Sequence, residues 1–192
     1  MRFTEIFGLW HPPALCFTIS FVGLSQLFAV LDHCQPKWYR NLSVVSFDEK
    51  YRLSFSTWKQ ITVNNFLNLL MTYVVGIALF VVLPSRETWN GLSEFPLWMQ
   101  ALACYIWGET WFWTSHWWVH QHPHRMRVVH AKHHEFRHLF AIVGLYCSPL
   151  EMLIVNWPLS IVFPILTRVH TTVFCLWMTV LGLHIANNHS IH

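Results

Sequence analysis

The chain has 192 residues, of which 54% are hydrophobic, 17% aromatic and only 11% charged. Soluble domains carry charge on about a quarter of their residues, so this composition excludes an ordinary soluble fold. The formal net charge is +3, and no glycine-rich phosphate loop accompanies it. The sequence therefore predicts no nucleic-acid partner.

Five apolar blocks follow one another along the chain: Leu9–Leu31, Phe66–Leu83, Phe95–Ser115, Met152–Thr167 and Val169–Ile185. A helix of about twenty residues spans a bilayer core of about 30 Å, so blocks of this length predict membrane spans. We expect an all-α, polytopic integral membrane bundle of about four to five spans or re-entrant segments, in one domain, 1–192.

The connections between these blocks are short. Asp48–Trp58 is predicted to be a polar connection on the membrane surface before the second span. The fourth block contains Pro158 and Pro164, which predict a kinked or re-entrant segment. Only Arg168 separates this block from the fifth, so the last two blocks form a hairpin.

Lysine and arginine set the expected orientation. Nine of them lie in segments 32–60 and 116–138, and three lie on the opposite side. Cytosolic loops carry the excess of positive charge, so both segments are predicted to face the cytosol, together with the C-terminal stretch His184–His192.

Two groups of histidines lie in the cytosolic segment 116–138. His116 and His120 are four residues apart and share one face of a helix, and His130, His133 and His134 can share a face of a second helix. Neutral imidazole suits iron, zinc and copper, and no cysteine lies among these histidines to suggest a thiolate zinc site. The two groups together predict a metal site.

A third group ends the predicted hairpin at the same membrane face. It contains His184, His189 and His192, whose spacings of five and three residues are looser. A structural or interfacial role remains open for His184 and His192.

Glu109 lies inside an apolar block and follows the spacing of the helix face that carries His116 and His120. A carboxylate within a membrane block usually marks a functional site, so Glu109 is a candidate for accepting an N–H hydrogen bond from a ligand histidine and orienting it. The alternative is a glutamate that extends to water at the end of the span. The metalloprotease motif HExxH is absent, so the histidines favour oxygen chemistry on a lipid over proteolysis.

These motifs resemble the fatty acid hydroxylase/sterol desaturase superfamily of membrane di-iron oxygenases. HxxxH at 116–120 followed by HxxHH at 130–134 resembles its opening pair of motifs. Stretches 109–116, 132–136 and 146–151 are similar to the branch that contains C-4 methylsterol oxidases and fatty-acid-hydroxylase-domain-containing protein 2. Stretch 188–190 resembles the family's His-Ser-Gly-Tyr, and the whole resemblance covers about residues 40–192.

The resemblance implies a ligand set, a cofactor and partners. The implied metal ligands are His116, His120, His130, His133, His134 and His189, with His184 as a looser candidate. It implies two iron ions, with zinc possible in a purified form, and O2-dependent oxidation of a sterol or fatty-acyl lipid in the endoplasmic reticulum. The electrons would come from an NAD(P)H-linked donor of the cytochrome b type.

Two positions depart from the family's pattern. Trp117 stands where the family usually has arginine, and the family continues to another HxxHH cluster whereas this sequence stops at His192. Two hypotheses therefore stay open: a lipid hydroxylase, or a truncated non-catalytic membrane protein that binds lipid, a partner subunit or a single structural metal. We expect the 192-residue chain alone to be inactive, because an ion without that cluster lacks ligands, and an extended version to be active.

Overall fold

The computed structural model describes residues 3–42, 53–82, 91–136 and 140–190, and all regular elements among them are helical. The long helices are α1 (Phe3–Cys34), α3 (Phe55–Val82), α4 (Leu97–His120) and α8 (Thr171–Asn188). Short elements connect them: α2 (Lys37–Leu42), η2 (Gly91–Glu94), α5 (Pro123–Arg125), the π-helical η3 (Met126–His130) and the 3-10 helix η4 (Ala141–Leu145). A further helical rod, the α6–α7 segment, runs through α6 (Pro149–Glu151), η5 (Met152–Asn156), η6 (Pro158–Val162) and α7 (Phe163–Leu166).

Most of the described residues of all five predicted apolar blocks lie in these helices, and two of the helices differ from expectation. Helix α3 begins at Phe55, inside the segment 48–58 that was predicted to be a surface connection. Of that segment, residues 48–52 lie outside the described residues. The proline-rich block remains helical and contains two π-helical stretches, η5 and η6. The second begins at Pro158, whose missing N–H interrupts the regular hydrogen-bond ladder of an α-helix.

Three of the helices are long and apolar enough to cross a membrane: Gly8–Cys34, Phe55–Val82 and Pro149–Leu166. Their outward faces are also apolar, since Ile19, Phe66 and Val81 are each more than 60% exposed. Exposed apolar surface on this scale is rare on soluble monomers and matches helices that contact lipid tails. The predicted all-α membrane bundle is confirmed.

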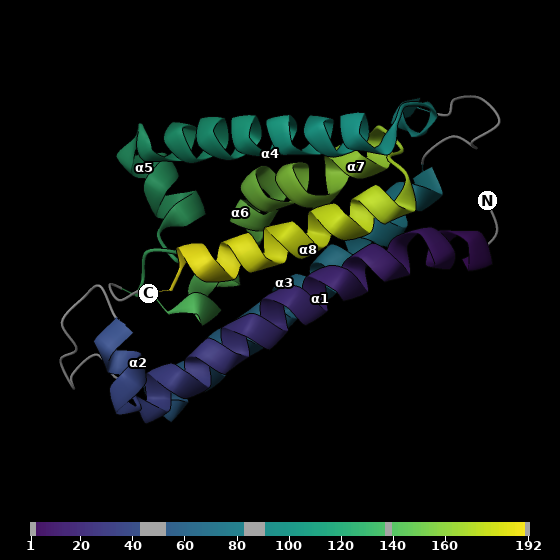
Figure 1. Ribbon diagram of the computed structural model, residues 1–192. Helices are drawn as coiled ribbons and strands as arrows, with labels where there is room; N and C mark the ends of the chain where they lie inside the picture. The colour runs from purple at the N-terminus through teal and green to yellow at the C-terminus, as the bar shows by residue number, and fades with distance from the viewer. Residues whose placement is uncertain (1–2, 43–52, 83–90, 137–139, 191–192) are drawn as a thin grey trace.

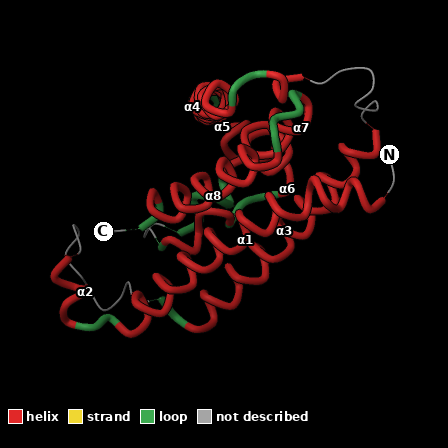
Figure 2. Tube along the Cα trace, turned by 45° about the vertical axis from the view of Figure 1, so that its right-hand side comes forward, coloured by secondary structure: helices red, strands yellow, loops and turns green. Residues whose placement is uncertain are grey.

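The helices form three layers (Figure 1, Figure 2). Helices α1 and α3 run side by side in one layer, α8 and the α6–α7 segment form the middle, and α4 covers the other side. The N-terminal half of α1 approaches α3 closely, because Gly76 leaves room for the buried ring of Trp10, whose Nε1 donates to the carbonyl of Tyr73 at 3.0 Å. Helix α2, helix α5 and the end of α8 lie at the same end of the bundle (Figure 1). The three histidine groups therefore emerge at one end.

Between the outer and middle layers lies a segment that is not part of any long helix. Helix η4 is buried, with Ala141 and Ile142 inaccessible to solvent, and the residues after it are buried as far as Cys147. It contacts α1, α3 and α8. Irregular backbone inside a membrane protein must be enclosed by protein, because lipid offers no hydrogen-bond partners.

Two asparagines of α3 satisfy this buried backbone. The side-chain amide of Asn65 donates to the carbonyl of Ile142 at 2.7 Å, and that of Asn68 donates to the carbonyl of Leu145 at 2.8 Å. Both asparagines are buried on a helix that is otherwise suited to lipid. Each side-chain amide donates to a buried main-chain carbonyl, which offsets part of the cost of a polar side chain in the membrane.

Replacing Asn68 by leucine tests this role. The substitution keeps the size of the side chain and leaves the carbonyl of Leu145 without its donor, so we expect a loss of about 1–3 kcal/mol in the free energy of unfolding. The measurement is thermal unfolding in detergent. Thr18→Val is the control, because the Thr18 hydroxyl bonds only to Ala14 of its own helix and is exposed. An equal loss of unfolding free energy in Asn68→Leu and Thr18→Val would contradict the role assigned to Asn68.

Candidate metal centre

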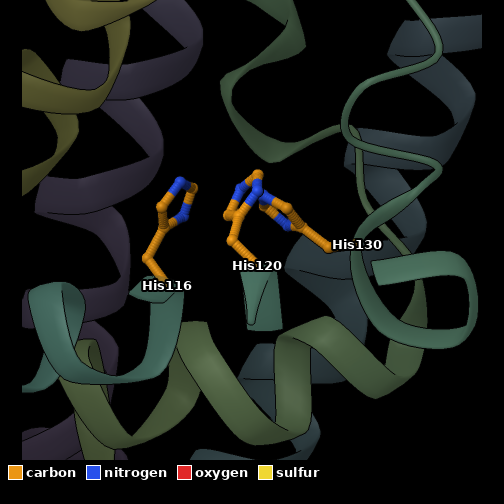
Figure 3. A group of neighbouring side chains, drawn as sticks. All are labelled: His116, His120 and His130. Atoms are coloured by element: carbon orange, nitrogen blue, oxygen red, sulfur yellow. The ribbon is translucent and has the colours of Figure 1, made fainter. Parts of the chain in front are cut away.

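Helix α4 supplies the first two histidines of the site. His116 and His120 are one helical turn apart, and their ring centroids are 4.6 Å apart. Figure 3 shows both side chains rising from α4 toward the ring of His130. The His116 ring also stacks on Phe112 of the preceding turn, at 5.3 Å.

His130 is the last residue of η3 and closes this first group. Its ring centroid lies 4.7 Å from that of His116 and 5.0 Å from that of His120. One ring nitrogen from each of the three histidines lies within 4.8 Å of the others. Metal–nitrogen bonds of about 2 Å place ligand atoms at most about 4 Å apart, so small side-chain rotations would bring this group to ligand distances.

The second histidine group differs from the expected helix. Helix η3 ends at His130, and the next four residues form a turn in which the His133 N–H donates to the His130 carbonyl at 3.0 Å. The turn still brings His134 beside the first group, with its ring centroid 4.6 Å from that of His130 and 5.2 Å from that of His120.

His133 joins this group to α8. Its ring centroid lies 5.1 Å from that of His130 and 5.1 Å from that of His189, the residue directly after α8. The Nε2 atoms of His133 and His189 are 3.1 Å apart. Six of the histidines predicted from the sequence are thus in one continuous cluster: His116, His120, His130, His133, His134 and His189.

A buried carboxylate lies under the cluster. Glu151, in the first turn of α6, is 3% exposed, and its Oε1 lies 2.8 Å from His130 Nδ1 and 4.0 Å from His133 Nδ1. In the tautomer that carries its proton on Nδ1, His130 donates to Glu151 Oε1. The His130 Nε2 lone pair is then free to bind a ligand.

Three atoms of this group are buried without a hydrogen-bond partner among the described residues: His130 Nε2, His133 Nδ1 and Glu151 Oε2. Each such atom costs stability, so a group of them indicates a site that is complete only with a bound partner. Two imidazole nitrogens and a carboxylate oxygen are ligands for a divalent transition metal. The residues present therefore fit a metal ion.

The electrostatics of the cluster also suit a metal. Burial lowers the pKa of His133 to about 3, with further contributions from the neighbouring His189, His130 and His134. Burial likewise lowers the pKa of His130 to about 4. Both imidazoles are therefore neutral at physiological pH, which is the state that binds metals.

Hydrogen bonds connect the loop that carries His133 and His134 to α3. Tyr146 donates its hydroxyl proton to Glu135 Oε2 at 2.7 Å, and Gln60 of α3 donates to the same Tyr146 hydroxyl at 2.7 Å. At the other end, the Ser148 hydroxyl donates to the carbonyl of Val129 at 2.7 Å and accepts from the Glu151 N–H at 3.1 Å. Ser148 therefore links the histidine segment to the start of α6 and to Glu151.

The other predicted site residues lie at the edge of the cluster or outside it. Glu109 is exposed on α4 and lines a cavity beside the site, as does His184, whose Nε2 lies 2.8 Å from the Asn188 amide nitrogen. His192 lies outside the described residues. Among the described contacts, Glu151 is the carboxylate that pairs with a site histidine.

Sequence reasoning assigned no role to Glu151. A signal for it was present, since a single glutamate at the entry of an apolar block usually has a functional partner. The distance in sequence between His130 and Glu151 conceals their contact.

A cavity of about 340 Å³ extends from the cluster between α4, α8 and the α6–α7 segment. Its walls near the histidines include His116, His133 and His189, and farther along α4 they include Tyr105 and Gly108. The volume is typical of a small-molecule site. The cavity therefore connects the histidine cluster with the apolar interior of the bundle.

Comparison with known proteins gives two similar sequences. "Fatty acid hydroxylase ahd1" of Mycosarcoma maydis is 33% identical over 91 residues, which are 46% of this chain and 24% of the relative. "Fatty acid hydroxylase domain-containing protein 2" of Macaca fascicularis is 31% identical over 71 residues, which are 37% of this chain and 21% of the relative. No protein-family model matches the chain, and no solved structure is similar to it.

The fold and the site define a helical membrane protein with a cluster of histidines at one end of the bundle, in which His130 is buried and His120 and His134 are exposed. One relative is named a fatty acid hydroxylase and the other a fatty acid hydroxylase domain-containing protein, so the sequence similarity supports a relation to the fatty acid hydroxylase superfamily. The similarity spans about a quarter or less of each relative's length.

The depressed pKa values predict how the metal-free chain responds to acid. The unfolded chain protonates its imidazoles near the usual pKa of 6.5, whereas His130 and His133 stay neutral until about pH 4 and pH 3. The free energy of unfolding should therefore lose nothing to these two histidines above pH 6.5, and it should fall as the pH drops toward 4. Melting temperatures measured across this range by circular dichroism test the prediction.

The control variants separate the buried histidines from the exposed ones. In His133→Ala the free energy of unfolding should fall less steeply with decreasing pH, because one imidazole with a lowered pKa has been removed. His122→Ala, at an exposed position outside the cluster, should keep the full decline. The prediction is wrong if His133→Ala and the parent chain lose stability in parallel.

Proposed function

We propose that this chain forms the metal-binding part of a lipid hydroxylase that uses two iron ions and O2. The ions would be held by the six clustered histidines, with His116, His120 and His130 in the group whose ring nitrogens already converge. Zinc is a second metal that suits the same imidazole ligands. His184, at the edge of the cavity, is proposed as a further ligand or as part of the cavity wall.

The observation that carries this proposal is the pairing of His130 with Glu151. The His130 Nδ1 lies 2.8 Å from Glu151 Oε1, and the buried Nε2 has no partner among the described residues. A histidine that donates its second N–H to a carboxylate is the usual arrangement of a metal ligand. The orienting role that the sequence suggested for Glu109 is therefore proposed for Glu151.

Iron at this site would supply the redox chemistry that allows O2 to oxidise an unactivated C–H bond. The chain's own residues do the remaining work. The neutral imidazoles bind without first losing protons, and Glu151 keeps the His130 ring in place. The cavity walls would hold an apolar chain beside the cluster.

The same geometry supports a membrane lipid as substrate. The cavity lies between helices of a membrane bundle, so a lipid can enter from the bilayer without passing through water. We propose that the histidine end faces the cytosol, at the endoplasmic reticulum, where an NAD(P)H-linked donor of the cytochrome b type would supply electrons. The exposed Arg127 and the other basic residues beside the cluster support this orientation.

Metal content gives a direct test of the site. The purified chain should bind iron or zinc, and His133→Ala combined with His134→Ala should remove most of it, because two imidazoles of the cluster are lost. The matched control is His122→Ala with His124→Ala, two exposed histidines outside the cluster, which should leave metal content unchanged. Elemental analysis after dialysis provides the measurement. Equal metal in both double variants would place the ligands elsewhere.

Activity is tested by NAD(P)H- and O2-dependent lipid oxidation in membranes that lack the host's own enzyme. The assay uses the chain alone and the chain extended by the last HxxHH cluster of the resembled family. Turnover by either form should be abolished by His133→Ala and retained by His122→Ala. Turnover that survives His133→Ala would refute the proposed site, and a lack of turnover in both forms would favour a non-catalytic lipid-binding protein.

A further inference from the structure

A second and smaller cavity lies inside the bundle, next to the cavity at the histidine cluster. This interior cavity has a volume of about 20 Å³ and lies between α1, α3, α8 and the α6–α7 segment. The residues that line both it and the histidine cavity are Asn156, Leu159, Leu181 and Ile185. A single layer of side chains therefore separates the two cavities.

On its other side, the interior cavity adjoins a groove in the lipid-facing surface. The groove has a volume of about 210 Å³ and lies between α1 and α3, where its lining residues Phe66 and Leu70 are 63% and 49% exposed. The residues that line both the groove and the interior cavity are Phe17, Leu69, Thr72 and Met178. The groove, the interior cavity and the histidine cavity thus follow one another from the lipid-facing side of the bundle to the histidine cluster.

The size of the interior cavity limits what can pass between the other two spaces. A cavity of about 20 Å³ accommodates one water-sized molecule. The histidine cavity, at about 340 Å³, has room for part of a lipid, whereas a lipid chain does not fit in the interior cavity. This connection therefore serves small molecules and not the lipid substrate.

The lining of the interior cavity favours an apolar occupant over water. Eight of its eleven lining residues are apolar. The Ser160 hydroxyl donates to the carbonyl of Asn156 at 2.6 Å, and the Thr72 hydroxyl donates to the carbonyl of Asn68 at 2.8 Å and accepts from Trp157 Nε1 at 2.9 Å. A buried water makes about three hydrogen bonds, and cavities with apolar walls stay dry and bind apolar molecules instead.

We infer that the interior cavity is a binding site for dioxygen, which enters it from the hydrocarbon of the membrane through the groove and continues to the histidine cavity. Dioxygen is small, uncharged and apolar, so hydrocarbon dissolves it better than water does. Met178 borders both the groove and the interior cavity, and its flexible unbranched side chain can move aside. This inference rests on the proposed function for the use of O2 at the histidines. It adds a site for O2 and a direction of supply.

Nuclear relaxation by O2 tests this site without metal or turnover. The chelator-treated chain, labelled at its methionine and isoleucine methyl groups, is held in detergent micelles under argon and then under O2 pressure. The unpaired electrons of O2 raise the relaxation rates of nearby methyl protons, and removal of metal prevents a contribution from bound iron.

Three buried methyl groups report on successive parts of the connection. Met178 lines the groove and the interior cavity, Met152 lines the interior cavity, and Ile185 lines the interior cavity and the histidine cavity. Ile142 is the control, because it is inaccessible to solvent and lines none of the three spaces. O2 should raise the relaxation rates of the three reporters several-fold more than that of Ile142.

Two neighbouring leucines of α3 provide matched variants. Leu69→Phe adds volume at the wall of the interior cavity, so the effect of O2 on Met152 should fall to that on Ile142. Leu70 lines the groove and not the interior cavity, so Leu70→Phe should leave the effect on Met152 as in the parent chain.

The outcomes separate this inference from the proposed function. An effect of O2 on Met152 that is no greater than that on Ile142 in the parent chain overturns the inference, and so does an effect that Leu69→Phe and Leu70→Phe change equally. If Leu69→Phe does not fold, the comparison of methyl groups in the parent chain decides. Loss of metal binding or turnover would count against the proposed function and leave the effect of O2 on the metal-free chain unchanged.

Discussion

The hydrogen bonds from Asn65 and Asn68 to the buried η4 backbone are the interactions on which the rest of the structure depends. They allow a 3-10 segment to pass through the interior of a membrane bundle, where unpaired carbonyls would otherwise be prohibitive. That passage brings the chain from the His133 loop to Ser148 and Glu151. Without it, the carboxylate that pairs with His130 would have no fixed position beneath the cluster.

Much of the fold could be predicted from the sequence because a bilayer imposes a simple rule on composition and length. The five apolar blocks each lie in a helix, and the histidine groups lie at one end of the bundle. The helix starts were less predictable. Helix α3 begins at Phe55 among polar residues such as Lys59 and Gln60, and Gln60 finds its partner in Tyr146, far away in the sequence. The buried η4 had no local signal, because its asparagine donors lie on another helix.

The histidine site shows the same division between features that local sequence predicts and features that depend on contacts between distant segments. Spacing along α4 was enough to place His116 and His120 together, since helical geometry is local. His130, His133 and His134 also converge, although they do so through a turn and not along one helix face. The contact between His130 and Glu151 joins two separate elements, so no local pattern could specify it.

The layered arrangement also has a consequence for the order in which the molecule assembles. Helix η4 contacts α1 and α3, which precede it in the chain, and α8, which follows. During synthesis, α1 and α3 are available first and present the asparagines on which η4 docks, and α8 then closes over it. A β-carbon at Gly144 of η4 would lie 2.5 Å from Ile185 of α8 and 3.3 Å from the His189 ring, so the glycine leaves the room in which the end of α8 packs on η4 and brings His189 to the cluster.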